Sequence, residues 1–303
     1  MKHNFTITLI LVGIFFVSQL LGLFIVSKYV TGVFINPETG EIENVTYKSL
    51  PLDMQRPAVE ASQSYLYILG AVLIGTILVL LIVKFRGLKL WKAWFFLSVG
   101  LCLTIAFAAF VNQFIAIMLG AVFAALKIYK PNVFLHNFTE VFIYGGLAAI
   151  FVPIMNIFAI VVLLILISIY DIIAVWQSKH MITMAKFQTE SKVFAGLSIP
   201  YSVPAQTKHG GKKAEKDSAV PTKKRIKQES KNAILGGGDI GFPLLFAGVV
   251  MKTTPFGKVI IIPAAVSIAL FLLLYFAQKD KFYPAMPFLS IGCFIGYGLL
   301  LLL

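Results

Sequence analysis

Two aspartates lie inside apolar stretches of this sequence, where a carboxylate is unexpected. Asp239 stands at the head of the run that continues from Ile240 to Val250, and Asp171 lies within the run from Leu166 to Trp176. On insertion scales, an acid at the centre of a membrane helix costs about 2.5–3.5 kcal/mol. Acids in such positions are therefore functional residues by default, and their chemistry gives the first hypothesis.

Two carboxyl groups held a few Å apart cannot both ionise cheaply, so they share a proton and titrate as a pair. Aspartic proteolysis requires this arrangement. The ionised acid takes a proton from water as the water attacks the scissile carbonyl, while the protonated acid donates a hydrogen bond to the carbonyl oxygen. Two membrane acids also suit a proton- or cation-coupled transporter or a leak channel, and this is the alternative hypothesis.

Other hydrolytic chemistries have little support in the sequence. Neither a His-Glu-x-x-His zinc pattern nor a Gly-x-Ser-Gly nucleophile pattern occurs, and Cys102 and Cys293 fall separately in apolar runs. We therefore expect no metal site and no cofactor.

The composition is typical of an integral membrane protein. The 303 residues are 59% apolar and 13% charged, whereas soluble globular proteins are about 25% charged. The net charge of +13 arises from loops between apolar runs, which indicates topology signals rather than nucleic-acid binding. We predict a multi-pass protein of the lipid bilayer, located in the cell membrane if the source is prokaryotic.

Nine apolar runs predict an all-α polytopic fold with nine transmembrane helices. These runs are residues 5–27, 65–83, 91–110, 114–129, 133–152, 154–176, 235–251, 257–277 and 282–303. Lysine and arginine are more frequent in the loops on the side of the N-terminus. The N-terminus is therefore predicted to be cytoplasmic and the C-terminus to lie outside.

The runs divide the chain into three regions. Residues 1–176 hold the first six helices, residues 177–234 form a basic cytoplasmic loop, and residues 235–303 hold the last three helices. The loop is rich in Lys, Gly and Ser and poor in apolar residues, so it is predicted to be largely disordered.

Two further patterns concern helix packing. Glu140, near the start of the fifth run, is predicted to snorkel to the membrane interface, with a polar contact between helices as the alternative. Gly292 and Gly296 are spaced as on a helix-packing face.

The predicted topology places the two acids at matching depth on consecutive antiparallel helices. Asp171 lies shortly before the cytoplasmic end of its run near Trp176, and Asp239 lies shortly after the start of the next run near Ile234. At 1.5 Å per residue, both lie roughly 7–8 Å from the cytoplasmic boundary. This predicts neighbouring positions, although nothing in the sequence shows that the side chains face each other.

Glycines before Asp239 and prolines near the last run are candidates to shape the site. Gly236 and Gly238 permit close backbone approach and unusual conformations, and small-residue packing at a loop-to-helix junction is the structural alternative. Pro284 and Pro287 leave backbone carbonyls without helical donors. Because such backbone is tolerated at membrane depth only where it is buried or lines a cavity, we expect this segment beside the acids.

Together these residues resemble a known family. Tyr170-Asp171, Gly236-x-Gly238-Asp239 and Pro284-Ala285-Met286-Pro287 are similar to the YD, GxGD and PAL motifs of the presenilin and signal peptide peptidase family of GxGD intramembrane aspartyl proteases. The resemblance includes motif order, spacing, nine spans and the long loop. With its predicted orientation and short termini, the chain is most similar to an archaeal presenilin homologue.

The resemblance implies that Asp171 and Asp239 form a catalytic dyad. It implies active-site support from Tyr170, Gly236, Gly238, Pro284, Ala285 and Met286. Met286 stands where the family usually has leucine, so we expect altered packing rather than lost activity. The implied substrates are single-span transmembrane proteins whose helices partly unwind. The sequence leaves a homo-oligomer open and makes no accessory subunit evident.

Overall fold

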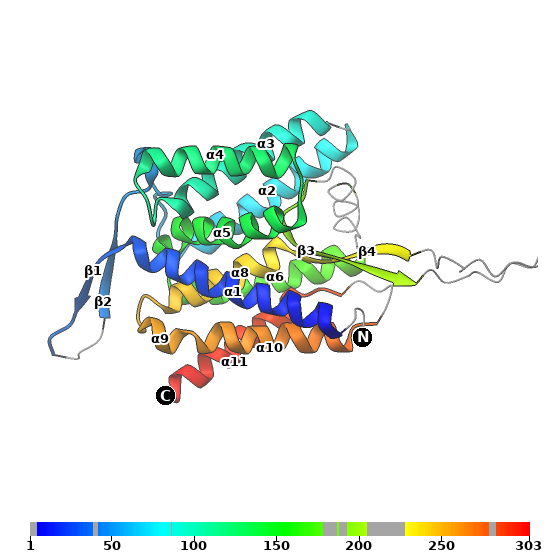
Figure 1. The fold of residues 1–303 in the computed structure, drawn as a ribbon. Helices are drawn as coiled ribbons and strands as arrows, with labels where there is room; N and C mark the ends of the chain where they lie inside the picture. The colour runs from blue at the N-terminus through cyan, green and yellow to red at the C-terminus, as the bar shows by residue number, and fades with distance from the viewer. Residues whose placement is uncertain are drawn as a thin grey trace, which may run out of the picture.

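Helices form most of the described structure (Figure 1). The computed structural model describes residues 5–38, 42–85, 87–177, 187, 193–204, 228–278 and 283–303. The helices are α1 (Phe5–Tyr29), α2 (Ser64–Lys84), α3 (Leu88–Phe107), α4 (Gln113–Tyr129), α5 (Val133–Phe151), α6 (Ile157–Ile172), α8 (Gly237–Val250), α9 (Phe256–Val259), α10 (Ile261–Phe276) and α11 (Met286–Leu301). Short turns cover Pro51–Asp53 (η1) and Val152–Ile154 (η2), and a π-helical turn, Ile173–Gln177 (η3), follows α6. These helices overlap all of the predicted apolar runs.

Six helical stretches of the described chain are long and apolar enough to cross a membrane. They are Phe5–Tyr29, Ser64–Lys84, Leu88–Phe107, Val133–Ile154, Ile157–Gln177 and Phe256–Phe276. Helices α4, α8 and α11 are shorter apolar helices. The polytopic helical fold is therefore clear, whereas nine crossings and the direction of insertion stay predictions.

Asparagine residues cap the first turns of three helices. Asn112, Asn132 and Asn156 precede α4, α5 and α6 in extended conformations. Each side-chain oxygen accepts a hydrogen bond from a backbone amide two or three residues further on, at 2.8–3.0 Å. Such caps satisfy donors that the first helical turn leaves unpaired, which explains why the chain turns into a new helix at these points.

Helix α8 lies within the bundle and packs against α1, α5, α6, α10 and α11 (Figure 1). All of its residues from Asp239 to Val250 except Phe242 are buried. The packing face predicted for Gly292 and Gly296 is confirmed. A Cβ atom at either glycine would lie 2.9 Å from an atom of α10, so only glycine permits this approach of α11 to α10.

The all-α prediction missed two antiparallel ribbons in the described chain. Strand β1 (Val30–Ile35) pairs with β2 (Ile42–Tyr47), and β3 (Gly196–Pro204) pairs with β4 (Gln228–Gly236). A search for long apolar runs does not detect such strands, because a ribbon edge carries polar residues and its apolar residues only alternate. In β4, for example, Ala233 and Leu235 are buried while Ile234 is exposed.

The two ribbons lie at opposite ends of the helix bundle, as do the beginning of α1 and the end of α11 (Figure 1). We refer to these as the β1–β2 end and the β3–β4 end. The predicted disorder of the 177–234 loop falls mainly on residues 178–186, 188–192 and 205–227, which lie outside the described residues.

Candidate active site

Asp171 and Asp239 come together at the β3–β4 end of the bundle. Asp171 lies in the last turn of α6 and Asp239 in the first turn of α8, and these two helices pack against each other. Both aspartates are buried. The antiparallel arrangement expected from the sequence therefore brings two buried acids to the adjoining end turns of packed helices.

The start of α11 binds the first acid. The backbone N–H of Met286 donates a hydrogen bond to Asp171 Oδ2 at 3.0 Å, and the Met286 side chain is buried in the main core. Pro284, just before α11, is buried as well. The prolines were expected to expose carbonyl acceptors near the acids. The contact observed here is instead an amide donor, because the first N–H groups of a helix have no intrahelical partner.

Hydroxyl contacts hold α6 between its neighbours. Thr76 Oγ1 of α2 donates to Val72 O at 2.8 Å and lies 3.0 Å from Tyr170 Oη. Since a hydroxyl carries one proton, Tyr170 is the donor in that pair. On another side of α6, the Oγ atoms of Ser168 and Ser290 lie 2.9 Å apart and connect α6 to α11. Tyr170 therefore ties the helix of Asp171 to α2.

The three glycines before Asp239 have different surroundings. Gly236 ends β4 in an extended conformation, and a Cβ atom there would lie 3.2 Å from Asp239 Oδ2. Gly238 is exposed, and its Cβ would make only an ordinary 3.5 Å contact with the Phe242 ring. The closest approach is at Gly237, where a Cβ would lie 2.7 Å from Tyr144 Oη. The sequence motif had instead singled out Gly236 and Gly238, which lie on either side of Gly237.

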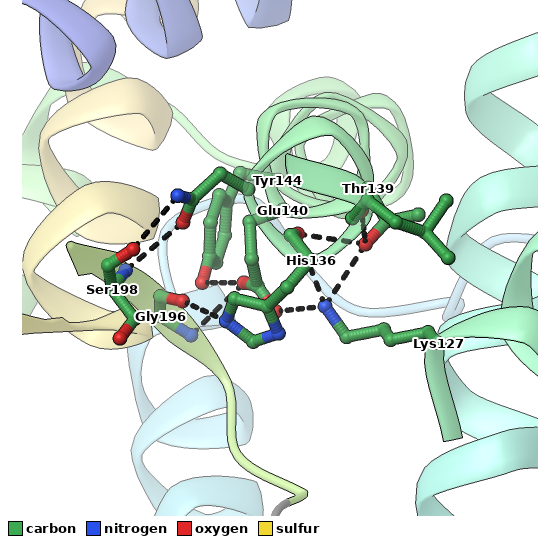
Figure 2. A network of polar contacts seen from close by, with 9 residues as sticks. Lys127, His136, Thr139, Glu140, Tyr144, Gly196 and Ser198 are labelled. Atoms are coloured by element: carbon green, nitrogen blue, oxygen red, sulfur yellow. Dashed lines mark hydrogen bonds and ion pairs between the residues drawn. The ribbon is translucent and has the colours of Figure 1, made fainter. Parts of the chain in front are cut away.

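A buried ion pair beside the site was also missed. Glu140 of α5 and Lys127 of α4 form a 2.6 Å ion pair, with side chains 0% and 3% exposed (Figure 2). The snorkelling prediction for Glu140 is thus wrong, and its alternative, a polar contact between helices, is what the structure shows. The sequence did contain a signal for this ion pair, namely the short turn from α4 to α5. It places the end of one helix beside the beginning of the next, so the two opposite charges could have been paired.

The fold and the site first define a class of protein, a polytopic helical protein with two buried carboxyl groups on neighbouring helices. The model of the family described as signal-peptide peptidase, presenilin aspartyl protease matches residues 42–303. The chain belongs to this family and is a multi-pass integral membrane protein.

Solved structures show the same fold. A presenilin family intramembrane aspartate protease, solved in a P2 space group, is 17% identical with a TM-score of 0.61, and the match covers 96% of each chain. A structure of such a protease in a C222 space group is 16% identical with a TM-score of 0.59, covering 95% of this chain and 94% of that one. The comparison with curated proteins found no match.

Proposed function

We propose that this protein is an intramembrane aspartyl protease in which Asp171 and Asp239 activate water to cut transmembrane-helix substrates. The observation that carries the proposal is the pair of buried carboxyl groups on α6 and α8, two helices that pack against each other. Membership of an aspartyl protease family supports it. A pair that shares one proton has both the base and the acid that peptide hydrolysis needs.

In the proposed reaction, the ionised carboxylate removes a proton from water while the water oxygen attacks the peptide carbonyl carbon. The protonated acid donates to the carbonyl oxygen, which gives a neutral gem-diol. Collapse of the gem-diol breaks the C–N bond and transfers a proton to the leaving nitrogen, leaving a carboxylic acid and an amine. Because both protonation states are required, we expect a bell-shaped dependence of kcat/KM on pH.

The length of α8 bears on how water and substrate meet the acids. Its 14 residues span roughly 21 Å at 1.5 Å per residue, which is less than the roughly 30 Å hydrocarbon core. A substrate helix hides each peptide carbonyl in its own hydrogen bonds, so the helix must unwind locally before attack. We infer that unwound substrate meets the acids where α8 begins.

The supporting roles are part of the proposal. The Met286 amide orients the Asp171 carboxylate, with Pro284 and Ala285 setting the start of α11. Tyr170 holds the helix of Asp171 through Thr76. Gly236 leaves room for the Asp239 carboxylate, and Gly238 continues the turn into α8.

We also propose nine membrane crossings with a cytoplasmic N-terminus, which places the β3–β4 end and both acids on the cytoplasmic side. Single cysteines in a background without Cys102 and Cys293 test this. Glu38→Cys at the β1–β2 end should react with an impermeant thiol reagent added outside intact cells, and Asn232→Cys should react only after lysis. The reverse pattern would overturn the orientation.

The first experiment is cleavage of a model single-span substrate by the purified chain in lipid, beside Asp171→Asn and Asp239→Asn. Asp53→Asn, an exposed aspartate in η1, is the matched control. Activity in wild type and control, with loss in both site variants, supports the dyad and shows that accessory subunits are dispensable. An inactive chain that conducts protons or cations into liposomes in an Asp-dependent way would favour the transporter hypothesis instead.

A further inference from the structure

Glu140 connects three elements around the candidate site (Figure 2). Its Oε1 atom accepts from Lys127 Nζ of α4. Its Oε2 atom accepts from the backbone N–H of Gly196, the first residue of β3, at 3.0 Å, and from the Tyr144 hydroxyl on the same helix. The carboxylate is fully buried. A buried charge with this many partners is held in one position, unlike a solvated side chain.

Side chains of α5 also hold the backbone of β3. His136 Nε2 lies 2.7 Å from Gly196 O. The Asn137 amide bonds both polar groups of Ser198, accepting from its N–H at 2.9 Å and donating to its C=O at 2.8 Å (Figure 2). Both backbone polar groups of Gly196 and of Ser198 therefore have partners on α5. The beginning of β3 is fixed to α5 as firmly as to a neighbouring strand.

Tyr144 connects the same carboxylate to the turn that carries Asp239. A Cβ atom at Gly237 would lie 2.7 Å from Tyr144 Oη, so the hydroxyl lies directly against this backbone. Gly196 pairs with Gly236 in the β3–β4 ribbon. Glu140 is thus connected to the Gly236–Gly237 backbone in two ways. It binds Gly196 of β3, which pairs with Gly236, and it binds Tyr144, which lies against Gly237.

We propose that Glu140 and Tyr144 are positioning residues that hold the Gly236–Gly237 backbone so that Asp239 faces Asp171. This inference rests on the proposed function, since it names residues that orient one acid of the dyad. Neither residue needs to touch substrate. A displacement of about 1 Å in a reacting group can lower the rate by about 100-fold, so backbone placement at this turn is a sensitive point.

The charge of Glu140 and its positioning contacts can be separated. Lys127 uses Oε1, whereas Gly196 and Tyr144 both use Oε2. Glutamine keeps one oxygen for the Oε2 contacts and presents its amide nitrogen toward Lys127. The clash of that nitrogen with the ammonium is removed by a second change, Lys127→Met. The double variant Lys127→Met/Glu140→Gln therefore removes the ion pair and retains the acceptor for Gly196 and Tyr144.

The test is Tyr144→Phe, measured for substrate cleavage beside Tyr29→Phe. Tyr29 is a matched control because its hydroxyl is also buried and donates to a backbone carbonyl, Ile105 O, at 2.7 Å. It lies at the β1–β2 end, far from the acids. We expect Tyr144→Phe to lower kcat by about 10- to 100-fold with KM little changed. We expect Tyr29→Phe to lower thermal stability without lowering kcat.

A second readout is the affinity for a peptide isostere with a central hydroxyl group, which mimics the gem-diol of the proposed reaction and is expected to bind between the two acids. It should fall in Tyr144→Phe in parallel with kcat and stay unchanged in Tyr29→Phe, because only the geometry of the acids changes. The double variant Lys127→Met/Glu140→Gln should retain kcat within about fivefold, as roughly 1 kcal/mol allows. Wild-type kcat in Tyr144→Phe, or an equal loss of kcat in the two tyrosine variants, would overturn the proposal.

Hydrogen exchange distinguishes failure of this inference from failure of the proposed function. If the wild-type chain cuts nothing, the protease proposal fails, but the amides of residues 235–241 still report the positioning. Their exchange should accelerate in Tyr144→Phe and not in Tyr29→Phe, while peptides from α10 stay unchanged in both. Unchanged exchange at residues 235–241 in Tyr144→Phe would reject the positioning role, whatever the activity.

Discussion

The two ends of the helix bundle place charged side chains differently: the cations at the β1–β2 end are half-buried, whereas the acids at the β3–β4 end are buried. At the β1–β2 end, cations satisfy backbone carbonyls: Arg56 donates to Ala149 O and Lys48 O, and Lys252 donates to Pro153 O and Met155 O. Ala149 O lacks its helical donor because Pro153, four residues on, has no N–H. Three of these carbonyls, those of Ala149, Pro153 and Met155, lie near the end of α5 or in the turn after it, where the cations act as capping groups do.

At the β3–β4 end, buried acids receive backbone donors, and the buried cation Lys127 pairs with one of these acids, Glu140. Asp171 accepts from the Met286 amide and Glu140 from the Gly196 amide. An acid that binds the start of a helix or strand fixes where that element begins. From this comparison we expect the half-buried cations at one end to serve stability and the buried acids at the other end to serve the proposed function. Variants at the two ends should separate these roles.

The electrostatics outside the membrane-spanning segments agree with a structural role for Arg56. Burial raises the pKa of Tyr47 to about 12, and the charge of Arg56 opposes that rise. Burial also lowers the pKa of Arg56, while Tyr29 and Tyr47 act in the other direction. Arg56 additionally lies over the Tyr47 ring, at 5.8 Å from its centroid. Within the described part of the chain, aromatic and carbonyl neighbours hold the guanidinium.

The largest expected effect on stability is that of Arg56→Met. It leaves the carbonyls of Ala149 and Lys48 without this donor, and an unsatisfied buried acceptor costs about 1–3 kcal/mol. We expect a clear fall in the midpoint of thermal unfolding in detergent, with kcat per folded molecule unchanged.

Lys28→Met is the control for Arg56→Met. Lys28 is exposed and lies over the Phe24 ring at 5.0 Å, a contact worth about 0.5–1 kcal/mol. The Lys28→Met variant should therefore lose less thermal stability than the Arg56→Met variant. A loss of kcat in Arg56→Met without a loss of stability would contradict the division between the two ends.

How much of this could be read from the sequence depends on whether a residue breaks a local pattern. Asp171 and Asp239 break apolar runs, so both could be singled out, and the helix boundaries follow apolar runs and asparagine caps. Whether the two side chains face each other depends on how α6 and α8 are rotated. Packing by distant residues sets that rotation, so only the structure could show it.

The features missed are those set by contacts between elements. Glu140 has the same pattern whether it snorkels or pairs, and Lys127 decides which of these occurs. The β3–β4 ribbon lies within a polar region, where its short alternation is hidden by its surroundings. Gly237 occupies a variable place in the recognised motif, yet its backbone is the one that meets Tyr144.

Gly237→Ala should have the next largest effect, now on activity at the β3–β4 end. The added methyl would lie 2.7 Å from Tyr144 Oη, and overpacking of this kind costs about 1–3 kcal/mol. Because the strain falls on the turn that carries Asp239, we expect kcat to fall with little change in KM.

Gly238→Ala is the matched comparison for Gly237→Ala. Its methyl would meet only the Phe242 ring at 3.5 Å, and alanine gains about 1 kcal/mol over glycine within a helix. Cleavage assays should therefore give a higher kcat for Gly238→Ala than for Gly237→Ala. The opposite rank would mean that Gly238, rather than the backbone against Tyr144, shapes the site.

The smallest expected effect is that of Tyr170→Phe, although Tyr170 lies next to Asp171 in the chain. Its hydroxyl donates to Thr76 of α2, and Thr76 keeps its own bond to Val72 O when that hydroxyl is removed. The change therefore removes a bond between helices worth about 1 kcal/mol, which corresponds to roughly a fivefold loss of rate. Thr76→Val should give a similar loss, and the double variant should lose less than the product of the two, because both single changes break one contact. A loss as complete as that of Asp171→Asn would instead place the Tyr170 hydroxyl among the reacting groups, and Tyr170 would then belong to the chemistry of the β3–β4 end rather than to its support.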